Sequence, residues 1–131
     1  MENVLNLSIV TPNGQIFNNK VTMVTLPGAD GEFGVMPGHA DTLSLLKTGV
    51  IELKKENGEI EYVAIDWGYT KVSEGSVDVL IDDAVLIDGV SEGEIANAVA
   101  KAKDLVEKAS DNTIAIGSVI SRIDQAGKNA L

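Results

Sequence analysis

The stretch GVIELKKENGEIEYVAI, residues 49–65, decides the fold because it holds two apolar–polar alternating runs on either side of a turn. Alternation with a period of two is typical of half-buried β-strands. Asn57 and Gly58 separate the runs and are a preferred pair for a two-residue hairpin turn in which both residues take a positive φ. We therefore predict a β-hairpin here, with Tyr62 and Ala64 on one face of its second strand.

The same kind of pattern extends over residues 1–87. Turn signals such as Thr11–Gly14 and Glu74-Gly75 interrupt short apolar runs about every 8–14 residues, which is close to the spacing typical of small all-β domains. This spacing predicts a sandwich or flattened barrel of short antiparallel strands.

The pattern changes near Asp88, where apolar residues begin to repeat every three or four positions, as in amphipathic helices. Ser91 and Glu94 have the spacing of a capping box, residues 110–113 favour a break, and Gly127 is expected to be a C-cap. The predicted apolar stripes are Ile95, Ala98, Val99, Ala102, Leu105 or Val106, and Ala109 in the first helix, and Ile116, Val119, Ile120 and Ile123 in the second. The chain is therefore predicted to be α+β, with an antiparallel β-sandwich domain over 1–87 and a two-helix hairpin domain over 88–131.

The predicted hairpin has two alternative roles. Its stripes are made mostly of small residues, and a second helix of about a dozen residues is marginal on its own in water. Each stripe can face the other helix, the sandwich or an outside partner. The hairpin is thus either a movable element or a permanently packed tail.

Composition excludes several classes of function. The 131 residues carry a net charge of −10, with 14 acids and 5 bases in residues 1–89, so nucleic acid and anionic lipid are disfavoured as partners. The absence of cysteine excludes disulfides and thiolate chemistry. The sequence has neither a signal-peptide pattern nor an apolar run of about 20 residues, so we expect no direct membrane insertion.

The crowded stretch LPGADGEFGVMPGHA, residues 26–40, suggests chemistry but matches no catalytic motif. Its glycines have neither Walker nor dinucleotide spacing, and no lysine follows them. His39 is the chain's single histidine, which is too little for a usual zinc site. Trp67 and Tyr69 could stack a base or sugar, although such aromatic residues more often pack a core or an interface. We predict no catalytic residue, no metal and no cofactor.

Three segments carry a family resemblance: VTPNGQIF (10–17), VTLPGADGEFGVMPGHA (24–40) and VDVLIDDA (77–84). Together with the helical hairpin behind them, they resemble the epsilon subunit of F-type ATP synthases of the bacterial type. The resemblance implies a β-sandwich of two sheets followed by two helices. It also implies a non-catalytic central-stalk subunit that couples rotation of the c-subunit ring to ATP synthesis.

The resemblance further implies partners and sites. The partners are the gamma subunit and the c ring, with the α/β catalytic subunits as possible contacts of helices that inhibit ATP hydrolysis. The location is the cytoplasmic face of the bacterial plasma membrane, as a peripheral complex. The implied gamma and c-ring interface is Glu32, Phe33, Val35, Met36, Pro37 and His39, and the implied regulatory helix residues are Ile95, Val99, Ala102, Val119, Ile120, Arg122 and Ile123.

The chain departs from one family motif. Some bacterial relatives bind ATP through Ile/Leu-Asp-x-x-Arg-Ala in the first helix, and here Glu94 and Asn97 stand at the Asp and Arg positions. A neutral amide cannot replace a guanidinium group on phosphate, so we expect weak or no ATP binding. The alternatives of another class are a ligand-sensing β-sandwich module with a mobile helical lid and a small hydrolase, and no motif supports the hydrolase.

Overall fold

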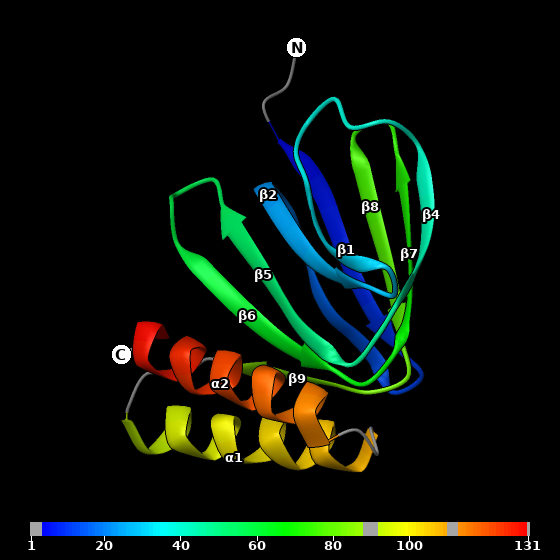
Figure 1. Ribbon diagram of the computed structural model, residues 1–131. Coiled ribbons are helices and arrows are strands. Elements are labelled where there is room, and N and C mark those ends of the chain that lie inside the picture. The colour runs from blue at the N-terminus through cyan, green and yellow to red at the C-terminus, as the bar shows by residue number, and fades with distance from the viewer. Residues whose placement is uncertain (1–3, 88–91, 110–112, 131) are drawn as a thin grey trace.

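The computed structural model describes residues 4–87, 92–109 and 113–130. It contains a β-sandwich followed by two helices, as the sequence predicts (Figure 1). The strands are β1 (Leu5–Thr11), β2 (Gly14–Gly28), β3 (Gly31–Val35), β4 (Thr42–Leu46), β5 (Gly49–Lys55), β6 (Ile60–Ile65), β7 (Gly68–Ser73), β8 (Ser76–Ile81) and β9 (Ala84–Ile87), and the helices are α1 (Glu92–Ala109) and α2 (Thr113–Ala130).

The strands form two layers that share β2. One layer runs β1-β8-β7-β4 and the other β2-β5-β6-β9. β2 is 15 residues long; its first half pairs with β1, and its second half pairs with β5, β3 and the end of β4. The hydrogen-bonded network is therefore continuous between the layers. The expectation of antiparallel strands is wrong for β1 and β8, which pair in parallel. These strands are far apart in the chain, so no hairpin turn forces them to be antiparallel.

Two apolar clusters organise the fold. The first fills the space between the layers and consists of Leu5, Leu7, Ile9, Val21, Val24, Leu26, Val35, Leu46, Ile51, Leu53, Val63, Ile65, Val72, Val77, Val79 and Ile81. The second lies between the outer face of β5-β6-β9 and the helices, and consists of Val50, Tyr62, Ala64, Ile87, Ala102, Val106, Ile123 and Ala126. β6 is consequently covered on both faces, because its successive side chains enter different clusters.

The hairpin over residues 49–65 is confirmed, but its turn differs from the prediction. β5 and β6 pair in register from Gly49 with Ile65 to Lys54 with Ile60. Gly58 alone has a positive φ, of 89°, and the described residues contain no positive φ outside glycine. The Gly58 N–H donates to Lys55 O at 3.0 Å, which closes a type I turn followed by a glycine bulge instead of a two-residue turn.

The helices form an antiparallel pair beneath β5, β6 and β9 (Figure 1). Lys103 Nζ on α1 lies 2.6 Å from Asp124 Oδ1 on α2. The prediction of Gly127 as a C-cap is wrong, since α2 continues to Ala130 and is longer than the predicted dozen residues. Gly127 is buried where the helices approach closely: a Cβ atom there would lie 2.6 Å from Val99 Cγ2. The predicted capping residue Ser91 and most of the predicted break lie outside the described residues.

Neither helix of the described part is long and apolar enough to cross a membrane.

Candidate interaction surfaces

The stretch 26–40 is mainly a β-hairpin and not the irregular loop that its composition suggests. Its first residues complete β2 and residues 31–35 form β3, with Gly28 paired to Gly31 across the turn. A second turn follows β3, where the His39 N–H donates to Met36 O at 3.1 Å. Pro37 and Gly38, with a φ of 91° at Gly38, are the residues that a type II turn prefers at its centre.

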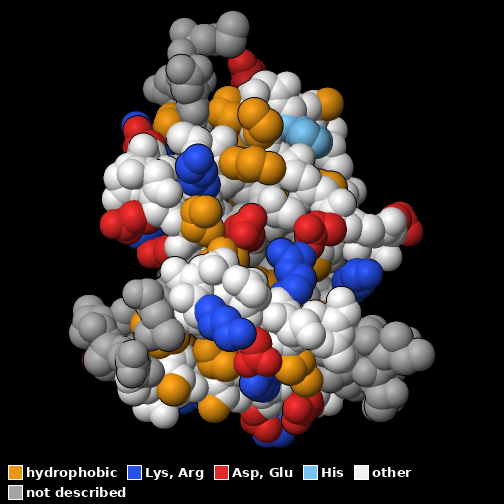
Figure 2. All heavy atoms as spheres, turned by 60° about the vertical axis from the view of Figure 1, so that its left-hand side comes forward, with side chains coloured by type: hydrophobic (Ala, Val, Ile, Leu, Met, Phe, Trp, Pro, Cys, Tyr) orange, Lys and Arg blue, Asp and Glu red, His pale blue; other side chains and the backbone are white. Residues whose placement is uncertain are grey.

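Glu32 lies at the start of β3 and faces α2. Its carboxylate Oε2 forms an ion pair with Arg122 Nη1. The two side chains are 45% and 36% exposed, so the pair is accessible to water. It lines a cleft of about 320 Å³ between α2 and the sandwich, together with Pro27, Lys47, Thr48, Gly49, Val50, Ser118 and Val119. Figure 2 shows basic and acidic side chains mingled at this height, where the helices meet the strands.

The other residues of the implied interface loop have different environments. Met36 is exposed, whereas Phe33, Pro37 and His39 are half-buried. His39 Nδ1 lies 2.7 Å from Ala40 O, so the ring donates to its neighbour's carbonyl. Val35 is fully buried in the core between the layers, so its side chain supports the fold and is not on the surface. His39 lies beyond the end of β3 distant from Glu32, and the two are not brought into one site.

The implied regulatory helix residues are packed against the sandwich and against each other. Ile95, Ala102 and Ile123 are buried, and Val99, Val119 and Ile120 are half-buried around the second cluster. The hairpin is therefore folded onto the sandwich in this structure. The polar contact from Asn129 Nδ2 to Tyr62 Oη, at 2.9 Å, also joins α2 to β6.

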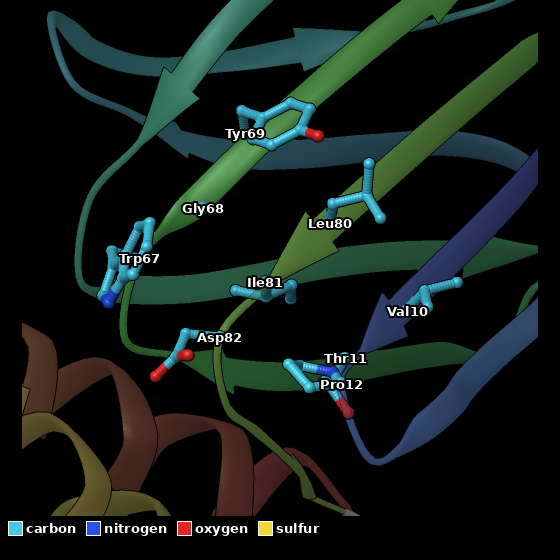
Figure 3. A pocket seen from close by; sticks show the side chains of 9 residues that line it. All are labelled: Val10, Thr11, Pro12, Trp67, Gly68, Tyr69, Leu80, Ile81 and Asp82. Atoms are coloured by element: carbon cyan, nitrogen blue, oxygen red, sulfur yellow. The ribbon is translucent and has the colours of Figure 1, made fainter.

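The outer face of the other layer carries an exposed apolar row. Leu45 pairs with Tyr69, Tyr69 with Leu80, and Leu80 with Val10, so one row crosses β4, β7, β8 and β1. The exposed fractions are 70% for Leu45, 43% for Tyr69 and 40% for Leu80. Trp67, at 59% exposed, stands at the edge of the row (Figure 3). We call Val10, Leu45, Trp67, Tyr69 and Leu80 the outer apolar band.

The sequence singled out only two members of this band. Three alternatives were given for Trp67 and Tyr69, namely stacking of a base or sugar, packing in a core and packing in an interface, and their exposure removes the core. The signal for Leu80 was available, since it falls out of phase with the buried Val79 and Ile81 of its strand. Apolar side chains on the outward phase of neighbouring strands are not needed for the core, and a contiguous exposed row of them is typical of an interaction surface.

Asp66 holds the segment before Trp67 in place. Its Oδ1 accepts hydrogen bonds from the backbone N–H groups of Trp67, at 2.6 Å, and Asp83, at 3.0 Å. Burial raises the pKa of this carboxyl, the two backbone donors oppose that effect, and the neighbouring Asp82 raises the pKa further. Asp66 thus joins the β6–β7 turn to the β8–β9 connection and fixes the end of the outer apolar band.

The described residues contain no group of three or more His, Cys, Asp or Glu side chains that could hold a metal ion. A hollow of about 330 Å³ on the outer apolar band is lined mainly by Val10, Pro12, Trp67, Tyr69, Leu80 and Ile81, with Asp82 at its edge (Figure 3). Such a lining suits an apolar side chain of a partner protein better than a reacting substrate.

Comparison with known proteins identifies a family and relatives that this chain resembles. The sequence model described as "ATP synthase, Delta/Epsilon chain, beta-sandwich domain" matches residues 4–87. The chain is similar to the ATP synthase epsilon chain of Wolinella succinogenes, with 58% identity over 131 residues and 100% of both chains covered. It is also similar to the ATP synthase epsilon chain of Helicobacter hepaticus, with 49% identity over 98% of both chains.

Two solved structures share the fold. A chain of the Euglena gracilis mitochondrial ATP synthase, in a cryo-EM structure of its OSCP, F1 and c-ring, has a TM-score of 0.64 at 23% identity. That match covers 96% of this chain and 76% of the other. A chain of the Tetrahymena thermophila mitochondrial ATP synthase, from a structure of its central stalk and c-ring, has a TM-score of 0.52 at 13% identity and covers 80% and 95% of the two chains.

Proposed function

This chain belongs to the ATP synthase delta/epsilon family, as an epsilon chain, and we propose that it is a non-catalytic rotor subunit of the central stalk that couples c-ring rotation to ATP synthesis. The fold supports this proposal because its described surfaces are suited to contact proteins. One outer face of the sandwich is covered by the helices, and the other carries the outer apolar band. The alternative of a ligand-sensing module is not favoured by the family relationship.

The observation that carries the proposal is the outer apolar band, which we assign to the gamma subunit. The hydrophobic effect favours burial of the band, and aromatic residues such as Trp67 and Tyr69 are enriched at the centre of protein interfaces. The next row across the same layer pairs Leu43 with Lys71 and Lys71 with Asp78, so it adds two charged side chains to one exposed leucine. Lys71 and Asp78 would give the interface a hydrophilic rim beside its hydrophobic centre.

Co-expression with the gamma subunit tests this assignment. We expect the wild-type chain to co-purify with gamma and Leu80→Lys to lose most of that binding, because a charge would be buried at the centre of the contact. Ile60→Lys is the matched control, since Ile60 is 49% exposed and lies in the other layer. Equal recovery of gamma with both variants would reject the band as the docking face, and no complex with the wild type would reject the rotor function.

The remaining contacts follow from the family relationship and the charge of the sandwich. We assign the c ring to the end of the sandwich that carries Glu32, whose carboxylate can pair with basic loop residues of the ring. Such a pair at a rim is worth about 1 kcal/mol or less, so it would fix register more than affinity. The location would then be the cytoplasmic face of the bacterial plasma membrane, as part of a peripheral complex.

The helical hairpin is proposed as a regulatory element that can leave the sandwich and reach the α/β catalytic subunits. Its stripe is rich in alanine, and small side chains bury little apolar area each. Deletion of residues 90–131 in the assembled synthase tests this role. A rise in ATP hydrolysis is expected, whereas unchanged hydrolysis would reject inhibition by the hairpin. As part of the same proposal, the β-sandwich domain ends at residue 87 and the helical hairpin domain begins at residue 88.

A further inference from the structure

The ion pair between Glu32 and Arg122 joins two parts of the molecule that the proposed function uses for different tasks. Glu32 belongs to β3, at the end of the sandwich assigned to the c ring, and Arg122 belongs to α2 of the regulatory hairpin. The two residues are 90 positions apart in the sequence. The same carboxylate therefore takes part both in the proposed ring contact and in holding the folded hairpin.

We infer that Arg122 and a basic residue of the c-ring loops compete for Glu32, so that seating on the ring loosens the hairpin. This inference rests on the proposed function, and it adds a mechanism by which the state of the hairpin reports contact with the ring.

The charges around the cleft favour competition over simultaneous binding. Lys47 lines the same cleft as Glu32 and Arg122. A cation of the ring at Glu32 would bring a third positive group into a cleft that Arg122 and Lys47 already line. Like charges in such a site repel one another more strongly than in bulk water. A ring cation would therefore have to displace Arg122 from Glu32.

The strength of the pair is suited to exchange. Both side chains are partly exposed, and an ion pair of this kind changes the equilibrium constant for docking only a few-fold. The apolar packing of α2 in the second cluster comes from Ile123, Ala126 and the half-buried Val119 and Ile120, which is a modest area. Loss of the ion pair would therefore move the docking equilibrium toward the undocked hairpin. The sandwich would stay folded, because its own core is the cluster between the layers.

Reciprocity gives the inference a quantitative form. If ring contact weakens hairpin docking by a given factor, hairpin docking must weaken ring contact by the same factor. For an exposed ion pair we expect this factor to be about two to five.

Fluorescence energy transfer on the full-length chain measures the docking half of the inference. The sequence has no cysteine, so Glu56→Cys and Gly117→Cys introduce two labelling sites without interference. Both positions are exposed, and a side chain at Gly117 meets open space. Arg122→Gln should raise the ratio of undocked to docked hairpin two- to fivefold. Lys128→Gln, which removes the same charge from an exposed position of the same helix, should leave it unchanged.

Affinity for a purified gamma–c-ring subcomplex measures the other half. Arg122→Gln should bind it two- to fivefold more tightly than the wild type, and Glu32→Gln should undock the hairpin but bind the ring more weakly. The exchanged variant Glu32→Arg, Arg122→Glu should restore docking while the ring contact stays weak.

Two results would overturn the inference. The first is an unchanged ratio of undocked to docked hairpin in Arg122→Gln. The second is a changed ratio with unchanged affinity for the ring, which would make the ion pair purely structural. If neither the wild type nor Arg122→Gln binds the subcomplex, the proposed function fails and the competition fails with it. Binding of equal strength by both would reject the competition alone.

Discussion

At the scale of single residues, Gly68 shows how little space separates β7 from β8. A Cβ atom at this position would lie 2.2 Å from Leu80 O and 2.9 Å from Ile81 Cα, and both are backbone atoms that cannot rotate away. The glycine between Trp67 and Tyr69 is therefore required by the strand pairing and not by a turn. It also lets the outer apolar band lie on closely spaced strands.

We expect Gly68→Ala to lower the free energy of unfolding by about 2–4 kcal/mol, because the two strands must separate to accept the methyl group. Gly34→Ala is the control, since its Cβ would meet side-chain atoms alone, the flexible end of Met23 at 3.0 Å and Thr25 Oγ1 at 4.0 Å. Urea denaturation of both variants measures the difference. Equal stabilities would show that β8 adjusts without cost.

Asp66 predicts a dependence of stability on pH. Because burial raises the pKa of its carboxyl, ionisation costs more in the folded state than in the unfolded state. Its contribution to stability is thus complete below the unfolded pKa of about 4 and is lost as the pH rises through the folded value. Asp66→Asn keeps an acceptor for the Trp67 and Asp83 N–H groups and does not ionise.

The measurement is urea denaturation of the wild type and Asp66→Asn from about pH 3.5 to about pH 8. This range begins near the ordinary pKa of an Asp carboxyl and extends well above it. The stability of Asp66→Asn relative to the wild type should increase with pH and then level off. Asp66→Ala, which removes the acceptor, should be less stable than Asp66→Asn at every pH. A difference between Asp66→Asn and the wild type that does not change with pH would contradict the raised pKa.

At the scale of the elements, the helical hairpin depends on close contact between α1 and α2. Gly127 faces Val99 with no room for a methyl group, whereas Gly117 lies on the exposed side of the same helix. Alanine is favoured over glycine in a helix by about 1 kcal/mol at either position. At Gly127, overpacking of about 1–3 kcal/mol opposes this gain.

We therefore expect Gly117→Ala to stabilise the hairpin and Gly127→Ala to be less stable than Gly117→Ala by about 1–3 kcal/mol. Helix content followed by circular dichroism during thermal unfolding measures this difference. If the two variants melt alike, the helices have room to move apart at Gly127, and the close contact is not important for stability.

The start of α1 carries the altered nucleotide motif. Asn97 is exposed on the helix and cannot supply the charge or the forked hydrogen bonds of an arginine. Isothermal titration of the full chain with ATP should show no binding in the micromolar range. The double variant Glu94→Asp, Asn97→Arg, which restores the Asp and Arg of the motif while Gly93 remains at its Ile/Leu position, should bind more strongly than the wild type. Micromolar affinity in the wild type would show that other groups hold the phosphates.

At the scale of the whole molecule, the sequence predicts the fold class well because both periodicities are strong. The β-hairpin over 49–65 and the change to helical spacing near Asp88 are enough to predict an α+β fold, a β-sandwich followed by a pair of helices. The structure confirms this prediction. The sequence pattern does not predict β3, because Gly31 and Gly34 weaken a strand pattern. The pairing of β1 with β8 could not be predicted, since distant segments meet there and periodicity carries no information on partners.

The interaction surfaces were only partly predictable for a related reason. The sequence indicates which residues are unusual, such as Glu32, Trp67 and Arg122, but not which of them become neighbours. The pairing of Glu32 with Arg122 and the alignment of Leu45, Tyr69 and Leu80 both arise from tertiary contacts. These contacts depend on strand register and helix docking, and neither is specified by local pattern.

The shared strand β2 has a mechanical consequence. Because one continuous backbone belongs to both layers, the layers cannot slide past each other without stretching covalent bonds or breaking the ladders to β1 and β5. A twisting load applied to the outer face of β1-β8-β7-β4 is therefore transmitted to β5-β6-β9 with little shear between them. The sandwich is built to turn as a stiff body, so the compliance of the chain is concentrated at the helices.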